Sequence, residues 1–405
     1  MELFKVHQDL VSRPLADVRA EVFSQLSALQ LPVPKGDIAI TVGSRGISNL
    51  PVIIRACGDW LKEQGASPFI VPAMGSHNGA TSAGQQSMVE SLGITAAAMD
   101  MPIRSSMDVV QIGEVRTGPV FMDRNCHESA GVLVVNRIKL HTCFSGPVQS
   151  GLTKMMVVGM GKIRSAQTFH SAGAAAMKDM LLEMGQFVLD SGRILAGLGI
   201  LEDGFDQTAE LHAIRPSDIL QRERELLQHH RQYFPSLPVD SLNVLIVRSI
   251  GKTYSGTGMD TNVIGRRGIR DFEDLDRPRV RVIGALELSA SSQGNALGVG
   301  NADFITKRLR DAIDEQKTLI NTLTTGDMDR AKIPATLATD EVLIQTIAER
   351  YGTSRWMLIP NTLHLEELLV SADLCEELAA SPRCRIEPKP VPLRFHNGHL
   401  LTPDS

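Results

Sequence analysis

Side chains suited to acid–base and covalent chemistry gather between His77 and His170. His77 lies in the segment MGSHNG, His141 follows shortly after the apolar run GVLVV, and Lys154 and His170 come after it. Histidine titrates near neutral pH and is the side chain used most often for general acid–base catalysis. An unprotonated lysine amine is a nucleophile. The pattern therefore favours an enzyme site in this part of the chain.

Each of these residues also has an ordinary interpretation. A loop histidine such as His77 is often a helix cap or simply exposed. Lys154 enters the otherwise apolar SGLTKMMVVG, where a lysine usually has a partner or a covalent role. Small residues before Lys154 are also typical of an anion-binding turn; they are Ser145, Gly146, Ser150 and Gly151. The GxxxxGK[ST] pattern of a P-loop does not occur here, and GMGKIRS, which contains Lys162, does not supply it.

The elements that must position these side chains alternate between strands and helices. Residues 37–43, the segment ASPFIVPA and residues 131–135 are apolar runs, and each is followed by a polar loop. Helical periodicity follows the first two, over 52–64 and 82–92. This alternation predicts a doubly wound parallel sheet, in which ligands bind outside the carboxyl ends of the strands. Arg45 follows the first of these strands, where it could clamp a carboxylate or phosphate.

The length of 405 residues exceeds that of one compact core and predicts two α/β domains with an interdomain cleft. We expect largely parallel, doubly wound sheets in both. The segment FPSLPVD has the composition of a linker. It predicts an N-terminal catalytic and cofactor domain at 1–238 and a C-terminal domain at 240–381. The tail 382–405 could return to the first domain. Other predicted elements are antiparallel pieces within 101–125, a solvated charged helix over 216–233, and a helix over 301–315.

Composition narrows the class of function. The net charge of −5 and the lack of a basic block argue against nucleic acid or an anionic membrane as partner. The five cysteines contain no CxxC pair, which argues against a disulfide framework or a structural zinc site. An N-terminus without an apolar signal core, and no run of about 18 apolar residues, predict a cytoplasmic protein. A small-molecule substrate is expected, and a homodimer is compatible with these features.

The order of these motifs resembles the nickel-dependent lactate racemase family. That family has an arginine loop, a G-T-H strand end, and a stretch of the form H…FSG…K…H. Here they read SRGISNLP, AMGSHNGAT and HTCFSGPVQSGLTK…TFH. The resemblance is distant and covers about residues 37–170.

The resemblance implies a role for each matching residue. Lys154 would bond to a nickel pincer nucleotide, pyridinium-3,5-bisthiocarboxylic acid mononucleotide, within the small-residue loop Ser145, Gly146, Ser150 and Gly151, and His170 would complete the nickel coordination. His77 and His141 would form an acid–base pair, and Arg45 would orient the substrate carboxylate. Sulfur donors with an imidazole suit nickel. The implied activity is racemisation or epimerisation of a 2-hydroxy acid by hydride transfer to the cofactor.

The second domain departs from the family pattern G-Y-P-x-D-x-N-x-Y-Q-x-x-K. Asp260 and Asn262 match it, but Ile264, Gly265 and Gly268 replace the tyrosine, glutamine and lysine that contact substrate. Arg266 or its neighbour Arg267 would restore the positive charge. We therefore expect a bulkier 2-hydroxy acid to fit better than lactate. The alternatives are a lyase, dehydratase or oxidoreductase acting on another acid, or a non-catalytic metabolite- or phosphate-binding protein of the same fold.

Overall fold

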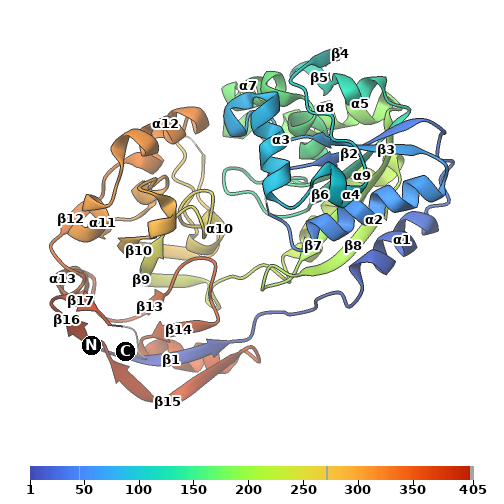
Figure 1. The fold of residues 1–405 in the computed structure, drawn as a ribbon. Coiled ribbons are helices and arrows are strands. Elements are labelled where there is room, and N and C mark those ends of the chain that lie inside the picture. Colours follow the sequence, from blue (N-terminus) through green and yellow to red (C-terminus); the bar gives the residue numbers. More distant parts are fainter. Residues whose placement is uncertain (45, 271, 402–405) are drawn as a thin grey trace. The chain divides into compact units, whose positions relative to one another are not determined.

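The computed structural model describes residues 1–44, 46–270 and 272–401, without the side chains of His170, Ala174, Thr324 and Thr325. The chain divides into two compact units, one of residues 11–234 and one that joins residues 1–10 to the chain from 235 onward (Figure 1). Both units are α/β, as predicted. Residues 1–10 and the tail strand thus share a unit, whereas the sequence-based division had placed residues 1–10 in the other domain.

The unit of residues 11–234 is built on a five-stranded sheet with the order β3-β2-β6-β7-β8. The strands β3, β2, β6 and β7 run parallel, and β8 is antiparallel to β7. Their bounds are β2 (Asp37–Val42), β3 (Ser67–Pro72), β6 (Gly131–Arg137), β7 (Ile194–Glu202) and β8 (Thr208–Ile214). The central strands are almost wholly buried because helices pack on both faces of the sheet.

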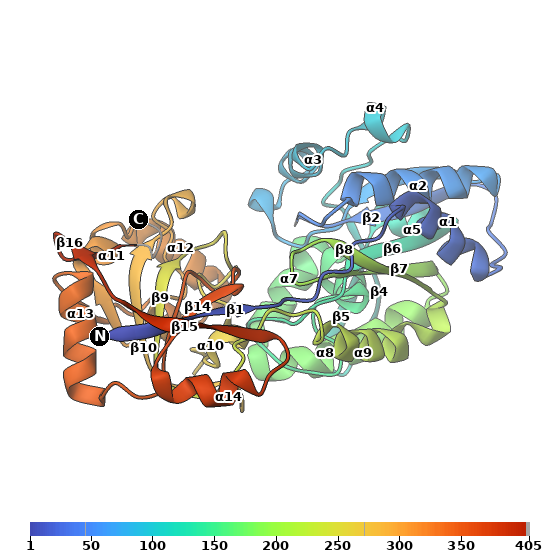
Figure 2. The same cartoon turned by 90° about the horizontal axis from the view of Figure 1, so that it is seen from below.

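Helices α1 (Val18–Ala28) and α2 (Leu50–Glu63) cover one face of this sheet, and α8 (Ala174–Asp190) and α9 (Ile219–His230) lie on the other (Figure 2). Helix α3 (Ser82–Ser91) confirms the prediction over 82–92. The antiparallel pieces expected within 101–125 are also confirmed. They form the hairpin of β4 (Val109–Val115) and β5 (Gly118–Asp123), which α4 (Ala96–Met99) precedes and α5 (Arg124–Glu128) follows.

Helix α9 corrects the prediction of a fully solvated helix over 216–233. One stripe of the helix is buried: Ile219, Glu223, Leu226, Leu227 and His230. The spacing of this stripe follows the helical repeat, but charged residues between its members hide it in the sequence. The buried stripe packs against β7 and α8.

The other unit contains an eight-stranded sheet with the order β12-β11-β10-β9-β13-β14-β1-β15. Neighbours from β12 to β13 are parallel, and those from β13 to β15 are antiparallel. The bounds are β1 (Glu2–Gln8), β9 (Ser241–Ile250), β10 (Arg279–Leu288), β11 (Phe304–Thr306), β12 (Ala335–Leu337), β13 (Trp356–Ile359), β14 (Glu367–Val370) and β15 (Cys384–Pro392). The hairpin of β16 (Phe395–His396) and β17 (His399–Leu400) follows. The tail therefore pairs with β1 in this sheet.

The helix expected over 301–315 was wrong. Strand β11 occupies part of that range, and the short helix α11 (Lys307–Asp311) follows it. Asp314 then caps a separate helix, α12 (Glu315–Thr325), by accepting a hydrogen bond from Lys317 N. The remaining helices are α10 (Thr261–Ile264), α13 (Asp340–Tyr351) and α14 (Cys375–Ala379). Among the described residues, no helix is long and apolar enough to cross a membrane.

Candidate active site

The two predicted acid–base histidines and Ser44, which the sequence had not singled out, follow three neighbouring strands of the unit 11–234. Ser44 follows β2, His77 follows β3, and His141 follows β6, while β2 pairs with both β3 and β6. Because parallel strands end at one edge of a sheet, the loops that carry His77 and His141 start from the same edge. Gly75 N donates to Gly159 O at 3.3 Å, which joins the His77 loop to the segment after Lys154.

His141 and Lys154 are in direct contact. The loop between them is closed by a bridge in which Lys139 N donates to Ser150 O at 2.8 Å and Ser150 N donates to Lys139 O at 3.3 Å. Lys154 Nζ then lies 2.7 Å from His141 Nε2. The imidazole packs against the buried ring of Phe144, with ring centroids 4.5 Å apart. The structure thus brings together two residues that the sequence had singled out separately.

The hydrogen bond from Cys143 favours one tautomer of the His141 ring. Cys143 N donates to His141 Nδ1 at 3.0 Å, and because a backbone N–H can only donate, Nδ1 carries no proton. A neutral imidazole must then carry its proton on Nε2, the atom that faces Lys154. In this tautomer Nε2 donates and Lys154 Nζ accepts, a role that requires the unprotonated amine. The arrangement favours an unprotonated, nucleophilic amine at Lys154.

Lys154 ends a short helix, α6 (Leu152–Lys154), that continues into a π-helix over Met155–Gly159. π-Helical turns are rare and frequent at functional sites. Glu223 lies beneath the start of α6 and accepts hydrogen bonds from Thr153 N at 2.8 Å and Thr153 Oγ1 at 2.7 Å. Burial raises the pKa of Glu223 to about 7, although the hydrogen bonds from Thr153 lower it. Sequence reasoning missed this residue, since it lies in a run of charged residues far along the chain.

The His77 loop is held by a second set of polar contacts. Ser44 Oγ is hydrogen-bonded to His77 Nδ1, and the exposed His77 side chain caps no helix. Gln85 Nε2 donates to Gly75 O at 2.9 Å. Lys162 donates to Pro72 O and, at 3.2 Å, to Gln85 Oε1. This network fixes the main chain from the end of β3 to the histidine.

Lys162 is part of this scaffold. Its side chain and that of Asp123 are both 0% exposed, and Lys162 Nζ lies 3.1 Å from Asp123 Oδ2. Asp123 in turn caps α5, accepting from Asn125 N at 2.8 Å. Lys162 is a fully buried amine that is paired with Asp123 and hydrogen-bonded to the main chain. Its role is therefore structural, and we do not count it among the candidate catalytic residues.

The small residues of the loop before Lys154 are closely packed. A Cβ on Gly146 would lie 3.0 Å from Lys178 Cβ, and one on Gly151 would lie 2.2 Å from Glu223 Oε1. Ser150 forms the bridge to Lys139, and Ser145 lies within the same loop. These contacts explain the glycines by packing.

The structure leaves one predicted site residue undescribed and describes only the main chain of another. Arg45 lies outside the described residues. His170 lies on α7 (Lys162–Ser171), and its side chain is not described. Within the described part of the chain, no group of three histidine, cysteine or acidic side chains could hold a metal ion.

The predicted residues of the other unit make local contacts. Asp260 caps α10 and accepts hydrogen bonds from Asn262 N at 2.9 Å and Asn262 Nδ2 at 3.0 Å. Arg266 donates to Asn301 O at 3.1 Å and lies 2.8 Å from Asp303 Oδ2. It also borders a cavity of about 240 Å³ in this unit. Gly265 has a left-handed φ of 77°, and its Cβ would lie 1.8 Å from Pro278 O. No other residue type fits there without rearrangement.

The solved structures that share the fold include a lactate racemase apoprotein and a protein from Thermotoga maritima. The lactate racemase apoprotein from Thermoanaerobacterium thermosaccharolyticum is 12% identical, with a TM-score of 0.56, over 90% of this chain and 99% of that one. A protein from Thermotoga maritima is also 12% identical, with a TM-score of 0.51, over 80% of this chain and 83% of that one. No family model matches the chain, and no curated protein matches it in sequence. At this identity the likeness shows the fold alone.

Proposed function

We propose that the chain is a racemase or epimerase of a 2-hydroxy acid that uses a nickel pincer nucleotide tethered to Lys154. The observation that carries the proposal is the contact between Lys154 and His141, whose hydrogen bonds favour an unprotonated amine. An amine in this state can form the covalent tether. The fold shared with a lactate racemase apoprotein supports the proposal.

The residues present fit such a cofactor. Lys154 would hold it covalently, the compact loop from Ser145 to Gly151 would lie beside it, and His170, on the helix that follows the π-helical turn, would supply a nickel donor. A neutral imidazole together with sulfur donors is a suitable ligand set for nickel. When bound, the cofactor would supply a hydride acceptor for the carbinol carbon of the substrate.

His141 and His77 would move the hydroxyl proton of the substrate. His141 Nε2, the nitrogen that carries the proton when Nδ1 accepts from Cys143 N, lies 2.7 Å from Lys154 Nζ. Formation of a covalent bond would consume the Lys154 lone pair and leave this proton available to a substrate oxygen. Ser44 is hydrogen-bonded to His77 Nδ1, and His77 would exchange the substrate proton through Nε2. Two histidines are needed because the hydroxyl points in opposite directions in the two enantiomers.

Intact-protein mass spectrometry with nickel analysis tests the proposal, on protein made in a host that synthesises the cofactor. Wild-type protein should carry the added mass and nickel, and Lys154→Ala should lose both. His170→Ala should keep the added mass and retain less nickel. Replacement of the exposed Lys35 by alanine is the matched control and should change neither. Product chirality then distinguishes a racemase from a lyase or an oxidoreductase. Wild-type protein with neither added mass nor nickel would refute the proposal.

A further inference from the structure

Glu223 is a buried acidic side chain directly beneath the turn that leads to Lys154. Its Oε2 accepts two hydrogen bonds from Thr153, one from the backbone N–H at 2.8 Å and one from the hydroxyl at 2.7 Å. The side chain is fully buried. Its Oε1 lies 2.2 Å from the position of a Cβ on Gly151. The carboxyl group therefore occupies the space that this glycine leaves open.

The same turn is held from two other elements. Asn136, at the end of β6, donates from Nδ2 to Gly151 O at 2.8 Å. On α8, a Cβ on Gly185 would lie 2.5 Å from Thr153 Cγ2, so the helix approaches the turn closely. Lys154 follows Thr153 directly. The backbone from which the amine extends toward His141 is thus held by contacts from α9, β6 and α8.

A carboxyl group is a costly way to fill buried space. Its burial is unfavourable unless hydrogen bonds compensate. Glu223 accepts these two hydrogen bonds from Thr153, the residue that precedes Lys154. This choice of partner points to a role in placing the lysine.

We propose that Glu223 is a positioning residue for Lys154: its carboxyl group sets the turn from Gly151 to Thr153 so that the amine meets His141 Nε2. The inference rests on Lys154 being the reactive lysine of the proposed function. It extends that function by naming a residue that acts through Thr153 and touches no substrate. A positioning role predicts that the reactivity of Lys154 falls when the carboxyl group is removed, although the protein remains folded.

Acetylation of the full-length apoprotein by limiting acetic anhydride measures this reactivity, with peptide mass spectrometry comparing Lys154 with the exposed Lys389. Glu223→Met leaves the buried Thr153 N–H and hydroxyl without their acceptor, so it should unfold at a lower urea concentration than wild type yet stay folded in buffer, while the Lys154-to-Lys389 ratio falls about tenfold. Glu223→Gln should stay within about threefold of wild type, because its amide oxygen can still accept from Thr153 N. Glu225→Gln, an exposed position on the same helix, is the control and should not change the ratio.

A folded Glu223→Met protein with the wild-type ratio would overturn the inference. If that variant does not fold, Thr153→Val and Thr153→Ser decide the question in the same assay. The serine keeps the hydroxyl that donates to Glu223 and should keep the ratio, whereas the valine should lower it; a wild-type ratio for valine would overturn the inference. The assay needs no cofactor. A failed nickel test and a failed positioning test are therefore distinguishable.

Discussion

Replacement of Lys162 by methionine should be among the most damaging single changes in the unit 11–234. The substitution keeps an unbranched side chain of similar length and removes the amine that lies 3.1 Å from Asp123. It also removes the donor to Gln85 Oε1, the amide that holds Gly75 O and the loop leading to His77. The variant should lose stability and the placement of His77 together.

The expected loss of stability in Lys162→Met follows from the burial of the ion pair. Both side chains of the pair are 0% exposed, and removal of one partner of a buried pair leaves an uncompensated charge at a cost of about 3–5 kcal/mol. Burial raises the pKa of the Asp123 carboxyl, while Lys162 lowers it. Without the lysine that pKa should rise further. Because a raised folded-state pKa means that stability is lost as pH rises, Lys162→Met should be closest to wild type in acid.

Tryptophan fluorescence can report the two units separately, because Trp60 lies in one and Trp356 in the other. In a Trp356→Phe background, urea unfolding followed by Trp60 gives the free energy of unfolding of the unit 11–234. The double variant Lys162→Met/Asp123→Asn should recover at least half of the loss. Its asparagine keeps an oxygen that can accept from Asn125 N and leaves no charge unpaired.

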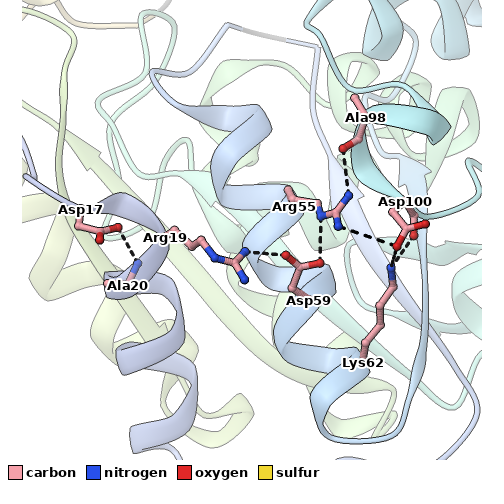
Figure 3. A network of polar contacts seen from close by, with 8 residues as sticks. All are labelled: Asp17, Arg19, Ala20, Arg55, Asp59, Lys62, Ala98 and Asp100. Carbon is pink, nitrogen blue, oxygen red and sulfur yellow. Dashed lines mark hydrogen bonds and ion pairs between the residues drawn. The ribbon is translucent and has the colours of Figure 1, made fainter.

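A surface ion pair provides the control. Figure 3 shows Arg19 on α1 and Arg55 on α2 reaching the same carboxylate, Asp59, with Arg19 Nη1 at 2.5 Å from Asp59 Oδ2. The Arg19 side chain is 50% exposed, so Arg19→Met should cost less than about 1 kcal/mol. The reasoning from burial would be refuted if Lys162→Met lost no more free energy of unfolding than Arg19→Met and the double variant showed no recovery.

Two further predictions concern single residues of the candidate site. Burial raises the pKa of Glu223 from 4.5 to about 7. Between pH 4.5 and about pH 7 the native state therefore binds more protons than the unfolded chain. The free energy of unfolding should fall by about 3 kcal/mol as the pH rises through this range. Glu223→Gln should abolish that slope in the same urea assay; an unchanged slope would show that another group titrates. If the proposed function holds, His77→Ala and His141→Ala should each reduce turnover of the hydroxy-acid substrate by about 10²–10⁴-fold with an unchanged circular dichroism spectrum. A variant that keeps wild-type turnover would remove its histidine from the acid–base pair.

The sequence by itself determined the local character of the elements that carry the candidate site. The apolar runs over 37–43 and 131–135, each followed by polar residues, predicted buried strands with site residues at their carboxyl ends, and β2 and β6 lie there. The helix over 82–92 and the antiparallel hairpin were predictable for the same reason, since periodicity and turn residues act over short stretches of chain. The positions of His77 and His141 after strands follow from these elements alone.

Only the tertiary structure decided which side chains meet. The strand order β3-β2-β6 and the pairing of β1 with β15 join segments distant in the chain, which local patterns do not encode. The contact between His141 and Lys154 depends on a loop closed by main-chain hydrogen bonds. Glu223 sits in the charged run RERELL, where the helical spacing from Ile219 to Leu226 and Leu227 marks its face but not that a carboxyl group on this face is fully buried. Its burial arises because α9 packs against the sheet and α6, a long-range event set by the whole fold.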